Sequence, residues 1–291
     1  MNGLRRAGAG CILVFAALLA GSEEHGPGTA GATPADCQRA KFRVVVDVGH
    51  TVGVPGAMSA RGVPEYTFNL RLGEEIRQAL LAAGFDKTVL LVVAQPPPLG
   101  LVERARRANN GAADIFLSIH HDSVPDYLLE TWEYNGQQNH FSDRFQGYAI
   151  FVSNDNADRA GSRKFASLLG RELQTRGLHY TPHYTLPLMK GRRRELVDAE
   201  AGVYRFDQLV VLRDTRMAAV LLEAGSIINR QEELELAGPD RRSQVSAAIT
   251  AAVENFCALR SRQRTNGTVE RLSRPSAPVH PVGAILPALA R

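Results

Sequence analysis

The chain has 291 residues, of which 44% are hydrophobic and 22% are charged, as in one large soluble domain or two small ones. Its formal net charge of +4 comes entirely from residues 261–291, which hold five arginines and one glutamate, so that the first 260 residues sum to zero. A nucleic-acid-binding domain needs its basic residues on a folded surface. The charge distribution therefore argues against nucleic acid as a partner.

Residues 1–22 have the pattern of a secretory signal peptide. Arg5 and Arg6 precede an apolar run from Cys11 to Ala20, and small residues follow it. A charged start, a short apolar stretch and a small-residue exit are typical of exported proteins, although a cytosolic N-terminal helix is the alternative. The run is too short to span a bilayer in the mature protein. We therefore expect a periplasmic or secreted protein without a stable membrane span.

Export would leave two cysteines, Cys37 and Cys257. An even pair in an oxidising compartment favours a disulfide, which would join the two ends of the folded domain. The alternative is a pair of buried free thiols.

Composition divides the rest of the chain into three parts. Residues 23–36 are rich in Gly, Pro, Ala and Thr and are predicted to form a flexible linker. Residues 261–291 contain four prolines and little that could pack, which is typical of a disordered tail, here a basic one. Residues 37–260 remain as the folded domain.

Within this domain, short apolar runs alternate with segments of helical periodicity. In chain order we predict a strand over 42–47, a helix over 66–83, a strand over 88–94, a helix over 101–111, strands over 114–120 and 148–153, a helix over 161–176, strands over 209–213 and 219–223, and a helix over 231–258. This alternation predicts a single α/β domain, with an open, mostly parallel twisted sheet covered by helices on both faces.

Three polar residues follow or end predicted strands, where ligands of such sheets bind: His50, His120 and Glu223. Glu65 joins them because Pro64 before it favours a helix start near the same loops. A hydrolytic zinc site needs three protein ligands and an open position for water, and a further carboxylate can move the proton. A single histidine at a strand end is usually an ordinary surface or hydrogen-bonding residue. A metal site is therefore indicated only where several such residues converge.

His120 has a neighbouring histidine, His121. Adjacent strand residues point to opposite faces, so we expect only one of the two to reach a shared metal. The sequence has no H-E-x-x-H motif, which excludes the common helical zinc peptidase arrangement.

Four segments carry a more specific pattern. They are VVVDVGH at 44–50, GVPEYTFNL at 62–70, R…AN…ADIFLSIHHDS between 104 and 123, and VLR…AVLLEAGSIIN between 211 and 229. In this order they resemble the motifs of the zinc-dependent N-acetylmuramoyl-L-alanine amidases of bacterial cell walls. The resemblance covers most of residues 43–235.

The resemblance assigns roles to individual residues. It implies that His50, Glu65 and His120 are the zinc ligands and that Glu223 is the catalytic glutamate, which transfers the proton. His121 falls where the family often has alanine, so it stays outside the ligand set. Asp47 either orients the loop that carries His50 or is simply a turn residue at a strand end.

The sequence departs from the family pattern at a few positions. Val48 stands in place of a proline, Thr51 and Val52 replace a glycine pair, and Ser226 replaces a phenylalanine. These changes alter the rim of the site but remove no expected metal ligand.

Two segments, 124–147 and 179–208, look longer than the family needs. Long loops beside a site are often lids, so one of them is a hypothetical gate; the alternative is surface elaboration. The arginine run 192–194 is more typical of a solvated face than of a clamp for peptide carboxylates. Trp132 could stack on sugar or cover the core.

The sequence thus predicts an exported amidase that uses zinc to hydrolyse the amide bond between N-acetylmuramic acid and L-alanine in peptidoglycan or muropeptides. One alternative is a zinc peptidase that cuts within the stem peptide. Another is an inactive peptidoglycan-binding or regulatory module, which the presence of all four site residues disfavours. No activating partner can be identified from the sequence.

Overall fold

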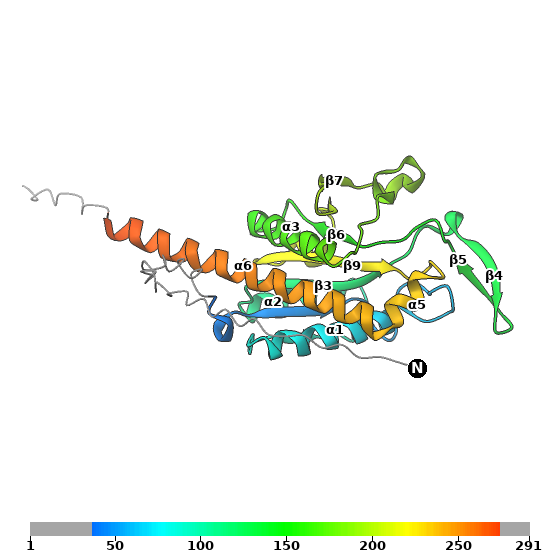
Figure 1. Cartoon of the computed structure of the whole chain (residues 1–291), viewed down its shortest axis with the longest axis horizontal. Helices are drawn as coiled ribbons and strands as arrows, with labels where there is room; N and C mark the ends of the chain where they lie inside the picture. Colours follow the sequence, from blue (N-terminus) through cyan, green and yellow to red (C-terminus); the bar gives the residue numbers. More distant parts are fainter. Residues whose placement is uncertain (1–36, 274–291) are drawn as a thin grey trace, which may run out of the picture. The chain divides into compact units, whose positions relative to one another are not determined.

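The computed structural model describes residues 37–273, in which a seven-stranded sheet is the central layer (Figure 1). The strand order is β2-β1-β3-β9-β6-β8-β7, and four of the pairings are parallel, whereas β6–β9 and β7–β8 are antiparallel. The strands are β1 (Val44–Val48), β2 (Val89–Leu91), β3 (Ile115–Asp122), β6 (Ala149–Val152), β7 (Glu195–Asp198), β8 (Val203–Arg205) and β9 (Ala218–Ser226). The predicted open, mostly parallel sheet is confirmed.

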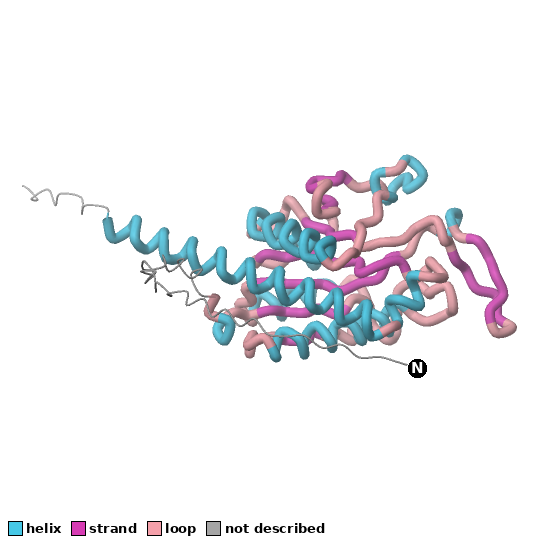
Figure 2. The backbone as a smooth tube through the Cα atoms, in the orientation of Figure 1, coloured by secondary structure: helices cyan, strands magenta, loops and turns pink. Residues whose placement is uncertain are grey.

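Helices cover both faces of this sheet (Figure 2). They are α1 (Glu65–Ala82), α2 (Leu99–Asn110), α3 (Arg159–Thr175), α4 (Val210–Arg213), α5 (Glu232–Ala237) and α6 (Pro239–Ser273), with short 3-10 turns η1 (Arg39–Lys41), η2 (Asp126–Leu128), η3 (His183–Thr185) and η4 (Pro187–Arg192). Residues of α1, α3 and α6 share one apolar core with the sheet. A second core, on the other face, takes in residues of α2 and α4. The predicted single α/β domain is therefore confirmed.

Helix α1 shows how the apolar spacing of the sequence produces this packing. Leu72, Ile76 and Leu80 are each at most 1% exposed and lie against the sheet. Phe68, one turn earlier, packs in a separate small cluster with Ile227 near the carboxyl end of β9. The helix is followed by Gly84, whose φ of +87° suits a residue without a side chain. Because the helix packs along the sheet in this way, its first residue, Glu65, lies beside the carboxyl ends of the strands.

Two of the predicted elements are wrong in type or extent. The strand predicted over 209–213 is the short helix α4, because an apolar run this short fits either structure and its buried side chains face α2. The helix predicted over 231–258 is two helices, α5 and α6, separated at Gly238. Helix α6 continues to Ser273, into the segment 261–291 that was predicted as a disordered tail. The first proline of that segment is Pro275, so no proline interrupts the helix before it ends.

The two long loops contain strands that we did not predict. Segment 124–147 holds an antiparallel hairpin of β4 (Glu130–Tyr134) and β5 (Gln137–Phe141), which projects from the molecule in Figure 1. Its turn is Asn135-Gly136, both with positive φ, a typical hairpin turn. Segment 179–208 supplies β7 and β8 to the main sheet.

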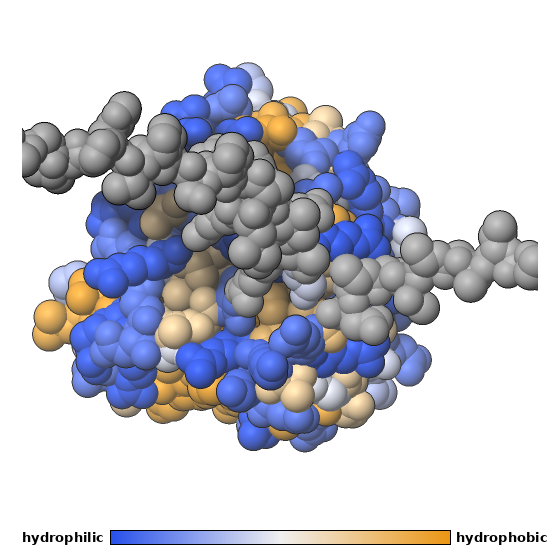
Figure 3. Space-filling model, turned by 90° about the vertical axis from the view of Figure 1, so that its left-hand side faces the viewer, coloured by the Kyte–Doolittle hydropathy of each residue, from blue (hydrophilic) through white to orange (hydrophobic). Residues whose placement is uncertain are grey.

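Cys37 and Cys257 form the predicted disulfide, with their Cα atoms 5.2 Å apart, so that the start of the domain is tied to α6. The predicted signal peptide, the predicted linker and residues 274–291 of the predicted tail lie outside the described residues. Within 37–273 no helix is long and apolar enough to cross a membrane. Figure 3 faces the side opposite the β4–β5 hairpin, and the part of it coloured by hydropathy is mainly hydrophilic.

Candidate metal centre and active site

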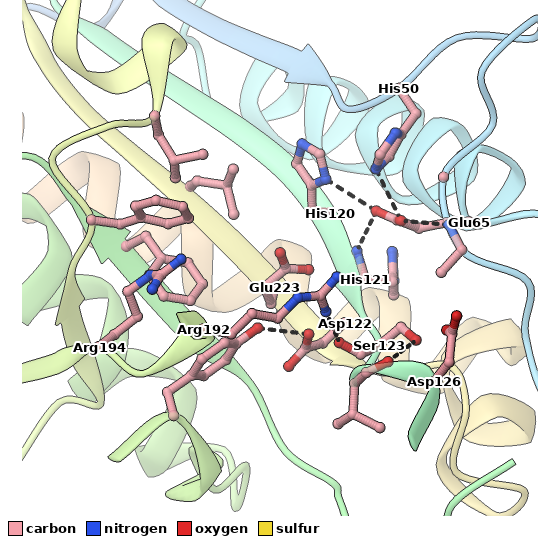
Figure 4. Close-up of a pocket in the computed structure, with 18 residues that line it drawn as sticks. His50, Glu65, His120, His121, Asp122, Ser123, Asp126, Arg192, Arg194 and Glu223 are labelled. Atoms are coloured by element: carbon pink, nitrogen blue, oxygen red, sulfur yellow. Dashed lines mark hydrogen bonds and ion pairs between the residues drawn. The ribbon is translucent and has the colours of Figure 1, made fainter. Parts of the chain in front are cut away.

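Three predicted ligands meet at the carboxyl end of the sheet. His50 lies just after β1, Glu65 is the first residue of α1, and His120 lies in β3. Their ligand atoms all lie within 4.8 Å of one another. His50 Nε2 is 3.0 Å from Glu65 Oε2, and His120 Nδ1 is 3.0 Å from Glu65 Oε1 (Figure 4). The side chains expected to converge do so.

Glu65 lies at the centre of this group and is held as a carboxylate. Burial raises the pKa of Glu65, but hydrogen bonds to His120 and His50 outweigh it, and the pKa lies well below its usual value. The side-chain amide of Asn69 and the backbone N–H of Ala57 also donate to it, at 3.1 and 3.2 Å. An ionised, fixed carboxylate is the form that binds a metal.

The donor set fits a zinc ion. Two imidazoles and one carboxylate are typical zinc ligands, and a catalytic zinc site keeps one further position open. All three residues line one cavity of about 580 Å³, so that side of the group is accessible. The chemistry of the residues therefore suits a hydrolytic metal centre.

Two glycines give the group its room. A Cβ on Gly49 would lie 2.3 Å from the His120 ring, and a Cβ on Gly56 would lie 2.4 Å from Glu65 Oε2. The residue with positive φ in this loop is His50 itself, at +65°. Gly49 matters because the strand end must approach the His120 ring closely.

Beneath the His50 loop lies a buried ion pair. The Asp47 carboxylate pairs with the Arg104 guanidinium and accepts a hydrogen bond of 2.7 Å from the Ser118 hydroxyl. Arg104 in turn donates to the backbone carbonyls of Val48 and His50. Asp47 thus fixes the arginine that holds the loop, which favours the orienting role over that of a simple turn residue.

His121 remains outside the metal-binding group, as expected. Its ring nitrogen Nδ1 is 2.7 Å from the Asn69 side-chain oxygen, and its ring lies against Phe68. Burial lowers the pKa of His121 to about 3, so the ring stays neutral at neutral pH. It packs the helix α1 against β3 rather than joining the three ligands.

Glu223, the predicted catalytic glutamate, lies in β9 opposite His120 in the ladder and lines the same cavity. Its Oε2 is buried and has no hydrogen-bond partner in the described part of the chain. Burial, and then the negative charges of Asp122 and Glu65, raise the pKa of Glu223 well above its usual value, while the Arg192 charge opposes this. Such an environment favours the protonated form of the carboxyl group, as is common for residues that transfer protons.

Sequence reasoning missed a further polar group, of which Asp122 and Tyr184 line the cavity. The Tyr184 hydroxyl, from η3, donates to Asp122 Oδ1 at 2.7 Å, and His183 Nε2 lies 3.3 Å from Asp122 Oδ2. Burial raises the pKa of Asp122 to about 7. Asp122 stands in a recognised motif, but His183 and Tyr184 come from the long segment 179–208 and match no motif.

Trp132 is held by neighbouring side chains. Its indole N–H donates to the Ala60 carbonyl at 2.7 Å, and its ring is stacked on Tyr134. The guanidinium groups of Arg61 and Arg230 lie over the same ring. The residue therefore fastens the β4–β5 hairpin to the segment that precedes α1.

The fold and the donor group define an α/β protein with a metal site of the hydrolase type. The family model for N-acetylmuramoyl-L-alanine amidases matches residues 44–255, and the chain belongs to this family. The family predicted from the sequence motifs is therefore confirmed.

Individual relatives are distant. The chain is 25% identical over 223 residues to N-acetylmuramoyl-L-alanine amidase AmiC of Neisseria meningitidis, covering 73% of this chain and 52% of that protein, so it spans about half of that relative's length. Among solved structures it is similar to the amidase Ami1 of Mycobacterium smegmatis, with 19% identity, a TM-score of 0.58, and 75% and 97% of the two chains covered. The catalytic domain of CwlV from Paenibacillus polymyxa gives 23% identity, a TM-score of 0.53, and 74% and 97% coverage. At this identity the two structures support the fold alone.

Proposed function

We propose that this chain is an exported zinc amidase that hydrolyses the bond between N-acetylmuramic acid and L-alanine in peptidoglycan or its fragments. The observation that carries the proposal is the convergence of His50, Glu65 and His120 beside Glu223 in one cavity. Family membership supports the choice of substrate.

His50, Glu65 and His120 would hold the zinc ion. When bound there, zinc would supply a Lewis acid that polarises the scissile carbonyl and makes a water molecule more acidic. Asp47 and Arg104 would keep the His50 loop in place while the substrate binds.

Glu223 would transfer the proton. Its carboxylate takes a proton from the attacking water, whose oxygen forms a bond to the lactyl carbonyl carbon. As the carbon–nitrogen bond breaks, Glu223 gives the proton to the departing alanine nitrogen. The products are a glycan with a free lactyl carboxylate and a peptide that begins with L-alanine. The raised pKa of Glu223 supports this role, because the group must both accept and release a proton.

Export is the second part of the proposal. The Cys37–Cys257 disulfide supports an oxidising compartment, as does the signal-like pattern of residues 1–22. We propose that the protein acts in the periplasm or outside the cell.

The Glu223→Gln variant tests the catalytic assignment. The amide keeps the size of the side chain but cannot take a proton, so we expect kcat on peptidoglycan to fall roughly 10²- to 10⁴-fold with zinc content unchanged. Glu133→Gln, an exposed position on β4, is the matched control and should retain full activity. Full activity in Glu223→Gln would contradict the assignment.

A further inference from the structure

Two arginines of the run 192–194 line the active-site cavity. Arg192 ends η4 and Arg194 lies just before β7, and both border the cavity that also holds His50, Glu65 and His120 (Figure 4). Arg193 between them is not among the lining residues; its Nε donates instead to the Thr185 carbonyl at 3.2 Å. Arg192 and Arg193 are exposed, as expected for a solvated face, whereas Arg194 is half-buried. Two of the three arginines nevertheless border the cavity.

Neither guanidinium of this pair forms an ion pair within 4 Å among the described residues, although the charge of Arg192 acts on the carboxyl groups of Asp122 and Glu223. Arg192 donates from Nη1 to the Ser123 carbonyl at 3.3 Å. Arg194 bonds through Nη1 to the carbonyls of Gly191 and Arg193, and its Nε is buried without a hydrogen-bond partner. Its guanidinium lies 3.7 Å from the centroid of the Phe206 ring. Donors of both residues are left for a ligand.

Several other arginines of the described residues form ion pairs. Arg61 lies 2.6 Å from Glu233, and Arg205 lies 2.7 Å from Glu195 and from Asp207. Burial lowers the pKa of Arg194, and the charge of Arg192 lowers it further. Two like charges, one exposed and one half-buried, therefore border the same cavity. An anion between them would relieve this repulsion, and a guanidinium fork matches a carboxylate.

The two halves of the proposed substrate differ in charge. The glycan half is neutral up to the scissile amide, whereas the stem peptide beyond L-alanine carries free carboxylates. A pair of arginines in the cavity therefore suits the peptide half.

We propose that Arg192 and Arg194 bind a carboxylate of the stem peptide, so that the enzyme prefers substrates in which the carboxyl group next to L-alanine is free rather than amidated. This inference rests on the amidase activity proposed above. Arg194 is fixed by Phe206 beneath it, and Arg192 lies nearer the rim. Both act by binding and orienting the peptide, not by moving protons.

The test uses two probes that differ in one carboxylate: N-acetylmuramoyl-L-alanyl-D-glutamate and N-acetylmuramoyl-L-alanyl-D-isoglutamine. We expect wild-type kcat/KM to be higher for the acid by roughly tenfold to a hundredfold, the usual effect of a hydrogen bond to a charged group. Arg192→Gln and Arg194→Gln should each remove most of this preference by lowering the rate on the acid only. Arg193→Gln is the matched control and should keep it.

Equal rates on the two probes in wild type, or an unchanged preference in both variants, would overturn the proposal. Should wild type cleave neither probe, its release of stem peptides from peptidoglycan decides the amidase proposal. The binding question is then decided by the affinity of zinc-supplied Glu223→Gln protein for the two probes, measured by calorimetry. If the Glu223→Gln protein binds the acid more tightly and this preference is lost on adding Arg192→Gln or Arg194→Gln, the proposed role of the two arginines is supported. Equal affinities overturn it. Thermal melting of each variant identifies any loss that comes from unfolding.

Discussion

At the scale of single residues, the close approach between Gly49 and His120 determines whether the metal-binding group can form. A side chain at residue 49 would place its first carbon 2.3 Å from the His120 ring, far inside normal contact. The ring would have to turn away from Glu65, to which it is now hydrogen-bonded at 3.0 Å.

We therefore expect Gly49→Ala to weaken zinc binding about 10- to 100-fold, as changes beside metal ligands commonly do. Competition with a chelating dye measures the affinity. Gly53→Ala is the control from the neighbouring loop, because a Cβ there meets nothing within 4 Å. Equal zinc affinity in the Gly49 and Gly53 variants would show that the His120 ring is not placed by this contact.

How much of the site could be predicted from the sequence also depends on individual residues. His50, Glu65, His120 and Glu223 could be found because each stands in a recognisable motif at the end of a strand or the start of a helix. Tyr184 could not be predicted as a site residue, because it lies in a segment without a motif and contacts Asp122 from 62 positions away in the sequence. Tyr184 reaches the cavity only through the folding of this segment.

At the scale of elements, long helices with regular apolar periodicity were predicted well, whereas the structure of short apolar runs was predicted poorly. Helix α1 has four apolar residues at spacing four, which is hard to mistake. The run at 209–213 is too short for any period to be read, and it forms α4. The Asn135-Gly136 turn was a signal for the β4–β5 hairpin, but the strands beside it are largely polar and exposed, so their pattern is weak.

The disulfide links elements that are far apart in the sequence. Cys37 and Cys257 are separated by 220 residues, and a closed loop of this length strongly restricts the unfolded chain. We expect the double variant Cys37→Ala/Cys257→Ala to lose about 2–5 kcal/mol of unfolding free energy, measured by urea denaturation.

The two cysteines are not among the residues that line the cavity, so zinc content and kcat should be retained in this double variant at low temperature. Wild type treated with a reducing agent is the matched comparison and should show a similar loss of stability. An unfolding midpoint equal to that of oxidised wild type would show that the bond contributes nothing.

The hypothesis that segment 179–208 gates the site also belongs to this scale. The segment contributes β7 and β8 to the main sheet and packs Tyr184 and Met189 into the second core. Deleting it would remove part of the fold, so any loss of activity would not identify a gate. In segment 124–147 the β4–β5 hairpin projects from the domain, whereas Val124 and Phe145 belong to a buried cluster. Deletion of the hairpin alone is therefore the better test of a gate.

At the scale of the whole molecule, the fold explains why distant residues share one cavity. Strands β1, β3 and β9 are adjacent and parallel, so their carboxyl ends lie at one edge, and α1 begins beside them. The sequence predicted this arrangement because alternating strands and helices allow few sheet topologies. It did not predict the antiparallel pairings of β6 with β9 and of β7 with β8, since strand direction there depends on long connections.

We propose that the chain cuts the bond between N-acetylmuramic acid and L-alanine with zinc held by His50, Glu65 and His120. The most direct test is to identify, by mass spectrometry, the ends released from peptidoglycan by zinc-loaded protein, by protein stripped with a chelator, and by stripped protein resupplied with zinc. We predict intact stem peptides beginning with L-alanine from the first and third samples and none from the second. Peptides cut within the stem, or equal release after zinc removal, would contradict the account.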